Sequence, residues 1–336
     1  MEVFVRRALR AAGLALLVLA MLGTAAWGVL ALFYFDGVGP GPRVALASAY
    51  ALAAFVALAA CLSPRWRWRA VAAYTVMFVL LLWRWMAIEP SNDRDWQTEG
   101  AVLPHASIEG DRVTVHNIRN FDYRSETDFT PAYYDRSFDL RRLDAVDLVA
   151  VYWMGPAIAH VFLSFGFGND HLAVSIEARK ERGEGYSTVQ GFFRRFELMY
   201  VVADERDVIG LRANHRHDPP EEVHVYRLFG APENLRPLFL EYMRQVNALA
   251  QRPEFYNTLT TNCTSNIWLH ASVLPGHLAY SWKVLASGYL PEYLYDAGKL
   301  DTRVPFAELE RRSIVNERAH AADKAEDFSR LIRMPP

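Results

Sequence analysis

Three long apolar runs in the first quarter of the chain constrain its fold more than any other feature. They cover about residues 9–33, 43–63 and 69–88. An α-helix rises about 1.5 Å per residue, so each run is long enough to cross a hydrocarbon core of about 30 Å. The first run exceeds the apolar segment of a signal peptide, about 7 to 15 residues, and two further runs follow it. The sequence therefore predicts three transmembrane helices within a domain of residues 1–89.

The basic residues around these runs predict how they are oriented. Two arginine clusters lie on the same side of the predicted bundle: Arg6, Arg7 and Arg10 before the first run, and Arg65, Arg67 and Arg69 before the third. Such basic flanks remain in the cytoplasm. An odd number of spans then places everything after residue 89 on the far side. We expect a multi-pass protein of the bacterial inner membrane, with a cytoplasmic N-terminus and a periplasmic domain.

Residues 90–336 read as one large globular domain without a repeat or a long linker. Residues 1–89 hold 8 arginines and 3 acidic residues, which leaves 28 basic and 35 acidic residues for this domain. An acidic surplus argues against nucleic acid as a partner. His215 and His217 are a weak metal signal without further ligands, and no phosphate-binding Gly-rich loop is present. We expect neither a metal nor an organic cofactor.

The pattern of the large domain is mixed α and β. Apolar stretches rich in β-branched and aromatic residues predict strands at 148–153, 159–167, 172–178 and 223–229. The turn signal "GND" joins the second and third strands into a hairpin. Apolar residues at helical spacing predict an amphipathic helix over 235–249. The segment 106–145 is rich in Arg, Asp and Tyr and predicts loops with little regular structure.

Cys263 lies in the polar stretch "YNTLTTNCTSNIWLH" of residues 256–270. Thr260, Thr261 and Asn262 are helix-capping types, so the pattern predicts a helix that begins at or near this cysteine. Exposed N–H groups and the helix dipole stabilise a thiolate at that position. A buried structural cysteine is the alternative interpretation, and both remain open. The other cysteine, Cys61, lies in an apolar run, so we expect it to be inert and no disulfide to form.

A thiolate nucleophile needs a base, and His160 is the best candidate. It begins a predicted strand, whereas His270 lies two helical turns from Cys263, about 10 Å away. With Asn169 and Asp170 as the hairpin turn, His160 opposes Arg179 and lies diagonal to Glu177 on the same face. His171 sits at the turn and is a poorer orienting group. A slip of two residues keeps the face unchanged but promotes a different partner, and a solvent-exposed face is the alternative.

These residues carry a resemblance. A His-bearing strand followed far downstream by Asn-Cys at a helix start is similar to the circularly permuted papain-like (NlpC-like) fold, including the lecithin:retinol acyltransferase relatives. More closely, the chain resembles the lipoprotein N-acyltransferase (Lnb) family over nearly all of residues 90–336. The resembling strings are "NIRNFDYRSETDF", "IAHVFLSFGF", "SIEARKERGEGYS", "YNTLTTNCTSNI" and "SGYLPEYLYDAGKLD". The implied architecture is a three-helix transmembrane bundle followed by an α+β permuted papain-like domain.

The resemblance implies an enzyme that moves an acyl chain from the glyceryl group of a bacterial lipoprotein to the α-amine of its N-terminal cysteine. The product is a lyso-form lipoprotein, and the partners are lipoproteins and the acyl chains of membrane lipids. Cys263 attacks the ester and forms a thioester that the amine resolves. His160 activates the thiol and protonates the leaving alcohol. Glu177 orients His160, with His171 as the alternative third residue.

Further roles follow from the same resemblance. Asn262 and the backbone N–H of Cys263 or Thr264 stabilise the oxyanion. Arg179 pairs with Glu177 or binds substrate. Two other functions remain open: a membrane-anchored papain-like peptidase or amidase of the cell envelope, and a binding module in which Cys263 is buried. An open polar groove favours the hydrolase, whereas an apolar channel from Cys263 favours acyl transfer.

Overall fold

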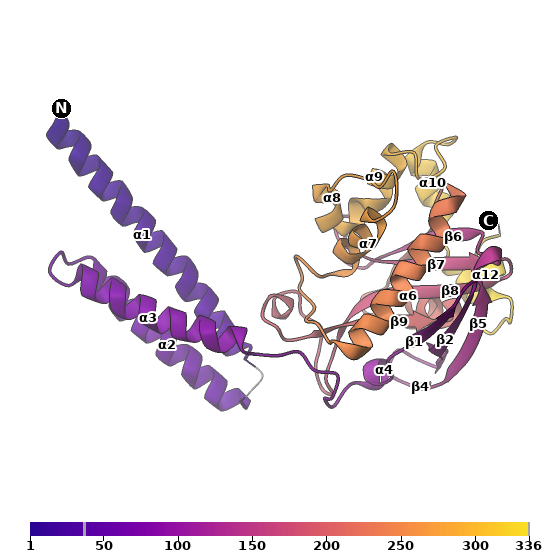
Figure 1. Cartoon of the computed structure of the whole chain (residues 1–336), viewed down its shortest axis with the longest axis horizontal. Helices are drawn as coiled ribbons and strands as arrows, with labels where there is room; N and C mark the ends of the chain where they lie inside the picture. Colours follow the sequence, from indigo (N-terminus) through magenta and orange to yellow (C-terminus); the bar gives the residue numbers. More distant parts are fainter. Residues whose placement is uncertain (36–37, 335–336) are drawn as a thin grey trace. The chain divides into compact units, whose positions relative to one another are not determined.

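The structure, a computed structural model, describes residues 1–35 and 38–334. The chain forms two compact units, one of residues 1–90 together with 187–195, the other of residues 91–186 together with 196–336 (Figure 1). The sequence pattern indicates the division after residue 89, but it gives no sign that residues 187–195, with the short helix η2 (Gln190–Phe192), group with the apolar helices.

The first unit contains three helices, α1 (Glu2–Phe33), α2 (Pro40–Cys61) and α3 (Arg67–Met86). Among the described residues, these helices are long and apolar enough to cross a membrane. Small residues let them approach closely: a Cβ built on Gly28 of α1 would lie 2.6 Å from the ring of Tyr50 in α2. Thr24 and Tyr74 join α1 to α3 through a hydrogen bond of 2.7 Å between their hydroxyls.

The described part of the second unit is built on an eight-stranded sheet with the order β1-β2-β9-β8-β7-β6-β10, in which β5 also pairs with β2. The strands are β1 (His105–Glu109), β2 (Arg112–Arg119), β5 (Tyr133–Asp139), β6 (Ala145–Tyr152), β7 (Ala159–Phe167), β8 (Asp170–Arg179), β9 (Glu197–Ala203) and β10 (Glu222–Arg227). A separate small ribbon is formed by β3 (Asp122–Tyr123) and β4 (Phe129–Thr130). The strands predicted at 148–153, 159–167, 172–178 and 223–229 correspond to β6, β7, β8 and β10.

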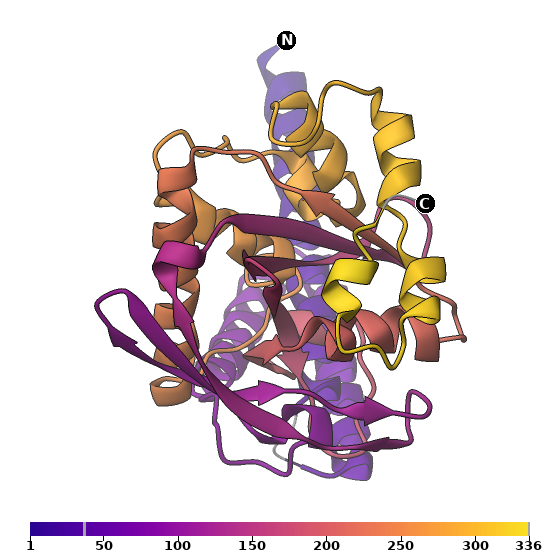
Figure 2. The ribbon, with the colours of Figure 1, turned by 90° about the vertical axis from the view of Figure 1, so that its right-hand side faces the viewer.

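The prediction that residues 106–145 have little regular structure is wrong. They form most of β1, all of β2 to β5 and the short helix η1 (Leu140–Arg142), and Figure 2 shows the long strands of this region at one side of the sheet. Val113 and Val115 alternate with polar residues along β2. The register then shifts between Val115 and Ile118, where Asn117 has a φ of 61°. This irregularity breaks the period-two pattern that would have indicated a strand.

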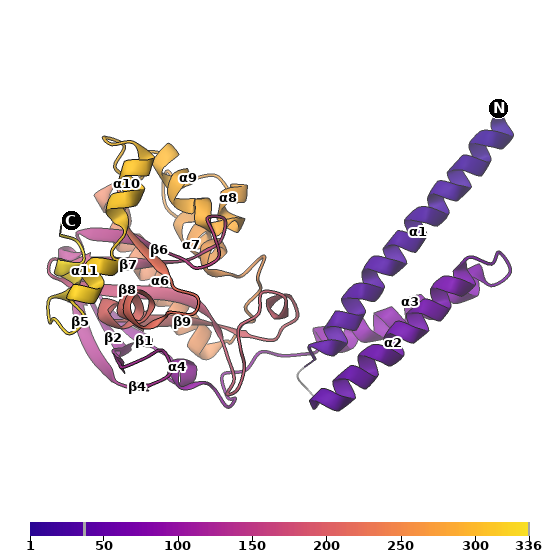
Figure 3. The same cartoon turned by 180° about the vertical axis from the view of Figure 1, so that it is seen from behind.

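Helices cover both faces of the sheet. On one face lie α6 (Leu235–Gln251), which crosses the strands in Figure 1, and α7 (Cys263–Ser272), α8 (Trp282–Leu285) and α9 (Leu290–Asp296). The other face is covered by α5 (Glu205–Gly210), the π-helical turn η3 (Leu211–His215), α11 (Asn316–Ala321) and α12 (Phe328–Leu331), seen in Figure 3. Further short helices are α4 (Thr98–Ala101), η4 (Pro232–Asn234), η5 (Ser287–Tyr289) and α10 (Phe306–Ser313). The central strands are thus buried on both sides, which accounts for their nearly continuous apolar sequence.

The C-terminal segment packs on the second of these faces. Phe328 and Ile332 are buried in its apolar layer. Arg333 donates to Asp147 over 2.7 Å and also pairs with the buried carboxylate of Glu205. This segment, to which the sequence assigns no role, therefore helps to close the core.

The β7–β8 hairpin differs from its predicted register by two residues. Phe167 pairs with Asp170, so the loop consists of Gly168 and Asn169. The reason is Gly168, which adopts a φ of 70° that a two-residue turn requires and that glycine accepts without strain. A shift of two preserves the face of each side chain, but it places His160 level with Glu177 instead of Arg179.

Candidate active site

Cys263 is the first residue of α7, and the residues before it explain why the helix begins there. Asn262 is the N-cap: its Oδ1 accepts from the Ser265 N–H over 2.8 Å and from the Thr264 hydroxyl over 3.0 Å. The amide nitrogen of Asn262 donates to the Thr258 carbonyl over 2.7 Å. The cap places half-buried Cys263 in the first turn, where the helix has unpaired N–H groups and positive dipole charge.

The thiol of Cys263 meets the start of β7. Hydrogen bonding to the imidazole of His160 and to the backbone N–H of Val161 lowers the pKa of the thiol. The pairing of β7 with β8 extends only from Phe167 to Leu163, although β7 pairs with β6 along its whole length. The first residues of β7 are therefore available to α7, and the structure brings together the two residues that the sequence predicts as nucleophile and base.

Glu177 and Ser175 of β8 complete the arrangement around the imidazole. His160 Nε2 lies 3.0 Å from Glu177 Oε1 and 2.7 Å from the Ser175 hydroxyl. Ser175 in turn donates to Glu177 Oε1 over 2.8 Å. Because Nε2 is directed at the carboxylate, Nδ1 is the ring nitrogen left for the thiol. Cys263, His160 and Glu177 thus have the connectivity of a nucleophile, a base and an orienting acid.

Arg212 is a further member of the site, and nothing in the sequence indicates it. It lies in η3, and its guanidinium donates to Glu177 Oε1 over 3.1 Å and to Glu221 over 3.3 Å. Arg212 is separated from Glu177 by 35 residues, and no motif surrounds it in the sequence. Only the packing of η3 against this face of the sheet reveals its position.

The electrostatics of the site favour an ion pair between Cys263 and His160. Burial acts to lower the pKa of His160, but the charge of Glu177 and the hydrogen bonds to Cys263 and Glu177 prevail and raise it to about 9. Burial acts to raise the pKa of the Cys263 thiol, but the hydrogen bond and charge of His160 and the N–H of Val161 bring it below the ordinary value. The pKa of Glu177 is held well below its usual range, against the effect of burial, by His160, Arg212 and Ser175. All three shifts therefore favour the charged forms of the site: a thiolate, an imidazolium and a carboxylate.

Arg179 does not belong to this group, which corrects the expectation that it pairs with Glu177. It is 2% exposed and its guanidinium donates to the Gly100 carbonyl over 2.8 Å and to Asn92 over 3.0 Å. It also lies over the ring of Trp96, 4.0 Å from the ring centroid. Arg179 thus fastens residues 92–101 to the sheet, and Arg212 takes the place beside Glu177.

The other predicted residues have mainly structural contacts. The Thr264 hydroxyl is buried and donates to the Val284 carbonyl over 2.6 Å. The side chains of Asn262 and Thr264 are both engaged, and the N–H of Ser265 is bonded to Asn262, so the backbone N–H groups of Cys263 and Thr264 are the first-turn donors left for a ligand. His171 lies near the turn of the hairpin with Glu205 among its neighbours, and His270 is buried against Tyr200.

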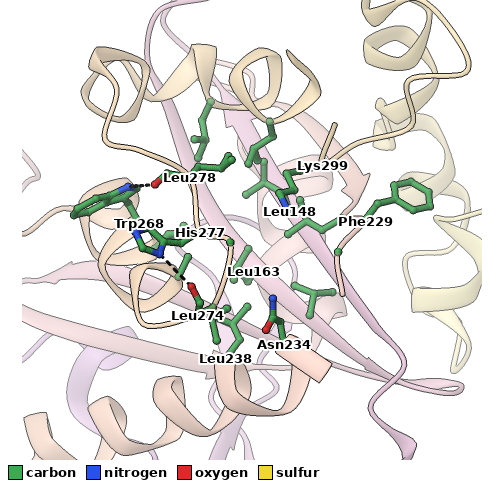
Figure 4. A pocket seen from close by; sticks show the side chains of 18 of the residues that line it. Leu148, Leu163, Phe229, Asn234, Leu238, Trp268, Leu274, His277, Leu278 and Lys299 are labelled. Carbon is green, nitrogen blue, oxygen red and sulfur yellow. Dashed lines mark hydrogen bonds between the residues drawn. The ribbon is translucent and has the colours of Figure 1, made fainter. Parts of the chain in front are cut away.

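An apolar cavity of about 180 Å³ lies beside α7, on the face of the sheet that carries α6. Leucines of β6, β7 and α6 form its floor: Leu148, Leu163 and Leu238, shown in Figure 4. Trp268 and His277 lie on one side of the cavity, and Phe229 and Lys299 on the other. Thr264, Ile267 and Ala271 of α7 also line it. The cavity therefore begins one residue along the helix from Cys263.

Within the described residues, no cluster of three or more His, Cys, Asp or Glu side chains is arranged to hold a metal ion.

Residues 129–288 match the family model described as the Lnb N-terminal periplasmic domain. The match includes β7, β8, η3 and α7, and so every residue of the Cys263, His160, Glu177 and Arg212 group. No curated protein and no solved structure matches the chain.

Proposed function

Because the chain is a member of the Lnb family, a membrane protein with a periplasmic domain, we propose that it is an N-acyltransferase of bacterial lipoproteins with Cys263 as its nucleophile. The observation that carries this proposal is the contact of Cys263 with His160 at the start of α7, with Glu177 bonded to the other ring nitrogen. A thiolate held in this way is prepared to attack an ester.

In the first half of the reaction the Cys263 thiolate attacks the ester carbonyl that joins an acyl chain to the glyceryl group of the lipoprotein. The carbonyl oxygen becomes an oxyanion, which the first-turn N–H groups of α7 stabilise. When the C–O bond breaks, the glyceryl oxygen takes the proton of the His160 imidazolium and leaves as an alcohol. A thioester on Cys263 and a neutral His160 remain.

In the second half the neutral α-amine of the lipoprotein's N-terminal cysteine attacks the thioester carbonyl. His160 takes a proton from the attacking nitrogen, and the C–S bond breaks. The products are an amide on the lipoprotein and the regenerated pair of thiolate and imidazolium. Glu177 keeps His160 oriented in both halves and favours its charged form, while Arg212 holds Glu177 in place.

The surroundings of Cys263 support an acyl substrate over a peptide. A peptide or amide in an extended groove needs hydrogen-bond partners for its backbone groups, whereas the cavity beside α7 is lined mainly by leucine and other apolar side chains. Membrane spans in the same chain keep the domain beside the bilayer, where lipoprotein acyl chains are concentrated. The peptidase alternative has no comparable support.

The fold and the location belong to the same proposal. The strand with His160 precedes the helix with Cys263 in the chain, the order expected of the circularly permuted papain-like fold. The arginine clusters before α1 and α3 favour a cytoplasmic N-terminus and a place in the bacterial inner membrane.

The test is product analysis by mass spectrometry after the detergent-solubilised protein is incubated with a synthetic diacylated lipopeptide. We expect a product of unchanged mass that carries one acyl chain as an amide and a free glyceryl hydroxyl. Cys263→Ala and His160→Ala should give none of it. Release of free fatty acid or cleavage of the peptide by the wild-type protein would refute acyl transfer to the amine.

A further inference from the structure

The apolar cavity beside α7 lies along the same side of this helix as Cys263. Cys263, Ile267 and Ala271 follow one another at intervals of four residues, so they form one stripe along the helix. Ile267 and Ala271 line the cavity, about 6 and 12 Å from Cys263 along the helix axis. A linear group attached to the sulfur of Cys263 and lying along this stripe would enter the cavity.

The cavity and the thiol also share one apolar environment. Cys263 packs against the same hydrophobic cluster that supplies Leu148, Leu163 and Ile267 to the cavity wall. The residues of α7 that line the cavity nearest to Cys263 are Thr264 and Ile267, and neither is charged. The hydroxyl of Thr264 is already hydrogen-bonded to the Val284 carbonyl. A hydrocarbon chain can occupy this path without stranding a polar group.

We propose that this cavity binds the hydrocarbon chain that Cys263 carries as a thioester, and that its walls determine which chain lengths the enzyme transfers. The inference rests on the proposed function and adds to it the site of the acyl chain. Each methylene withdrawn from water strengthens binding about fourfold, so a chain that fills the cavity is favoured over one that reaches only its entrance. The binding of long acyl chains depends on the distal part of the cavity, beyond Ile267, whereas the binding of short chains does not.

The experiment narrows the distal part of the cavity without touching the catalytic residues. Ala271 lies in α7 and is half-buried, so Ala271→Phe places a ring in the path of a long chain. Ala231 lines the cavity from another segment, and Ala231→Phe tests the same space without altering α7. Ala248→Phe is the matched control, an exposed alanine of α6 outside the cavity. Melting temperatures of all variants establish that they are folded.

Each protein is assayed with two lipopeptides that differ only in their acyl chains, hexadecanoyl or hexanoyl. We expect Ala271→Phe or Ala231→Phe to lower kcat/KM for the hexadecanoyl substrate at least tenfold and to change it less than twofold for the hexanoyl substrate. Ala248→Phe should leave both values unchanged. Equal effects of the cavity variants on both chain lengths, or no effect in folded protein, would overturn the inference.

The proposed function is tested separately by the wild-type protein in the same assay. If it transfers either chain to the amine, the proposed function is supported. The role of the cavity is then tested by the ratio of kcat/KM for the hexadecanoyl substrate to kcat/KM for the hexanoyl substrate in each variant. If it transfers neither, the proposed function fails, and the acyl-chain site fails with it.

Discussion

At the scale of single residues, the reactivity of Cys263 reports its contact with His160. Its thiol pKa lies below the ordinary value, so alkylation by iodoacetamide should become half-maximal at a lower pH than for an unperturbed cysteine. In His160→Ala burial and the negative charge of Glu177 still raise the pKa of the thiol, and only the N–H of Val161 still lowers it, so half-maximal alkylation should shift to higher pH.

The alkylation rates are measured against pH in a Cys61→Ala background, since Cys61 is the other thiol in the chain. An unchanged pH profile in His160→Ala would mean that the imidazole does not stabilise the thiolate.

A second prediction concerns the effect of Glu177 on the pH dependence of kcat/KM. The pKa of His160 is raised to about 9, chiefly by Glu177, so the protonated form, which in the proposed mechanism donates to the leaving alcohol, is lost as pH rises through about 9. In Glu177→Gln this cause is absent, whereas burial and Arg212 still lower the pKa of His160. The basic limb of the kcat/KM profile should therefore move to lower pH, with a loss of activity on the order of 10²-fold or more at pH 8.

The control for this variant is Glu181→Gln, which removes a carboxylate outside the catalytic group. Glu181 lies beyond the end of β8 and pairs with Arg94 over 2.9 Å. Glu181→Gln should retain both the basic limb and the rate of the wild-type protein. A Glu177→Gln profile that keeps the wild-type limb would show that the carboxylate does not set the charge of His160.

The sequence predicts Cys263, His160 and Glu177 as residues of the site, but it does not predict which arginine contacts Glu177. Cys263 and His160 stand out because capping residues surround one and a strand begins at the other. The alternation of side chains along β8 predicts that Glu177 lies on the same face of the sheet as His160. A register shift of two residues does not change this face. Arg212 could not be inferred, since its role depends on η3 packing over β8. Arg179 was misplaced because its partners, Asn92 and Gly100, lie in a segment without a recognisable pattern.

At the scale of elements, the start of β7 depends on its contact with η5. Gly288 donates to the Ala157 carbonyl over 3.1 Å, and the Ser287 hydroxyl accepts from the Ala159 N–H over 3.0 Å. A Cβ on Gly288 would lie 2.0 Å from the Pro156 carbonyl oxygen, which is backbone and cannot turn away. Gly288→Ala should therefore displace the segment that leads into His160.

We expect Gly288→Ala to destabilise the domain by about 1 to 3 kcal/mol and to lower kcat/KM, measured by thermal unfolding and lipopeptide turnover. Gly185→Ala is the matched control, since nothing lies within 4 Å of its added Cβ. Wild-type stability and activity in Gly288→Ala would show that the close approach does not position β7.

The elements themselves were predictable where the pattern was regular. The amphipathic spacing over 235–249 predicts α6, and the apolar stretches predict the buried central strands, because burial on both faces demands apolar residues throughout. The pattern does not predict β2 because the irregularity at Asn117 interrupts its alternation. It does not predict β1 and β5 because most of their residues are exposed or half-buried, so apolar residues do not mark them. The hairpin register was missed because both Gly168-Asn169 and Asn169-Asp170 suit a turn.

At the scale of the whole molecule, the arginine clusters predict which side of the membrane carries Cys263. A membrane-impermeant maleimide added to intact spheroplasts should label the Cys61→Ala protein at Cys263. Cys263→Ala should remain unlabelled, because Cys61 is buried among the apolar helices. Labelling of Cys263 only after the membrane is permeabilised would place the domain in the cytoplasm and contradict the orientation.

Composition predicts a division after residue 89, since the long apolar runs end where charged sequence begins. It does not predict the order of the strands, because β2 joins β9 through the single parallel pair of Arg119 with Ala203. Such long-range pairing leaves no local trace in a sequence.

Catalysis through Cys263 requires a thioester on this residue, and intact-mass analysis of the protein tests for it most directly. Wild-type protein mixed with a diacylated lipopeptide whose amine is blocked by acetylation should gain the mass of one acyl chain, since no acceptor can resolve the intermediate. Neutral hydroxylamine should remove that mass, and Cys263→Ala should never acquire it. An unmodified wild-type protein, or an adduct that persists in Cys263→Ala, would contradict catalysis through this cysteine.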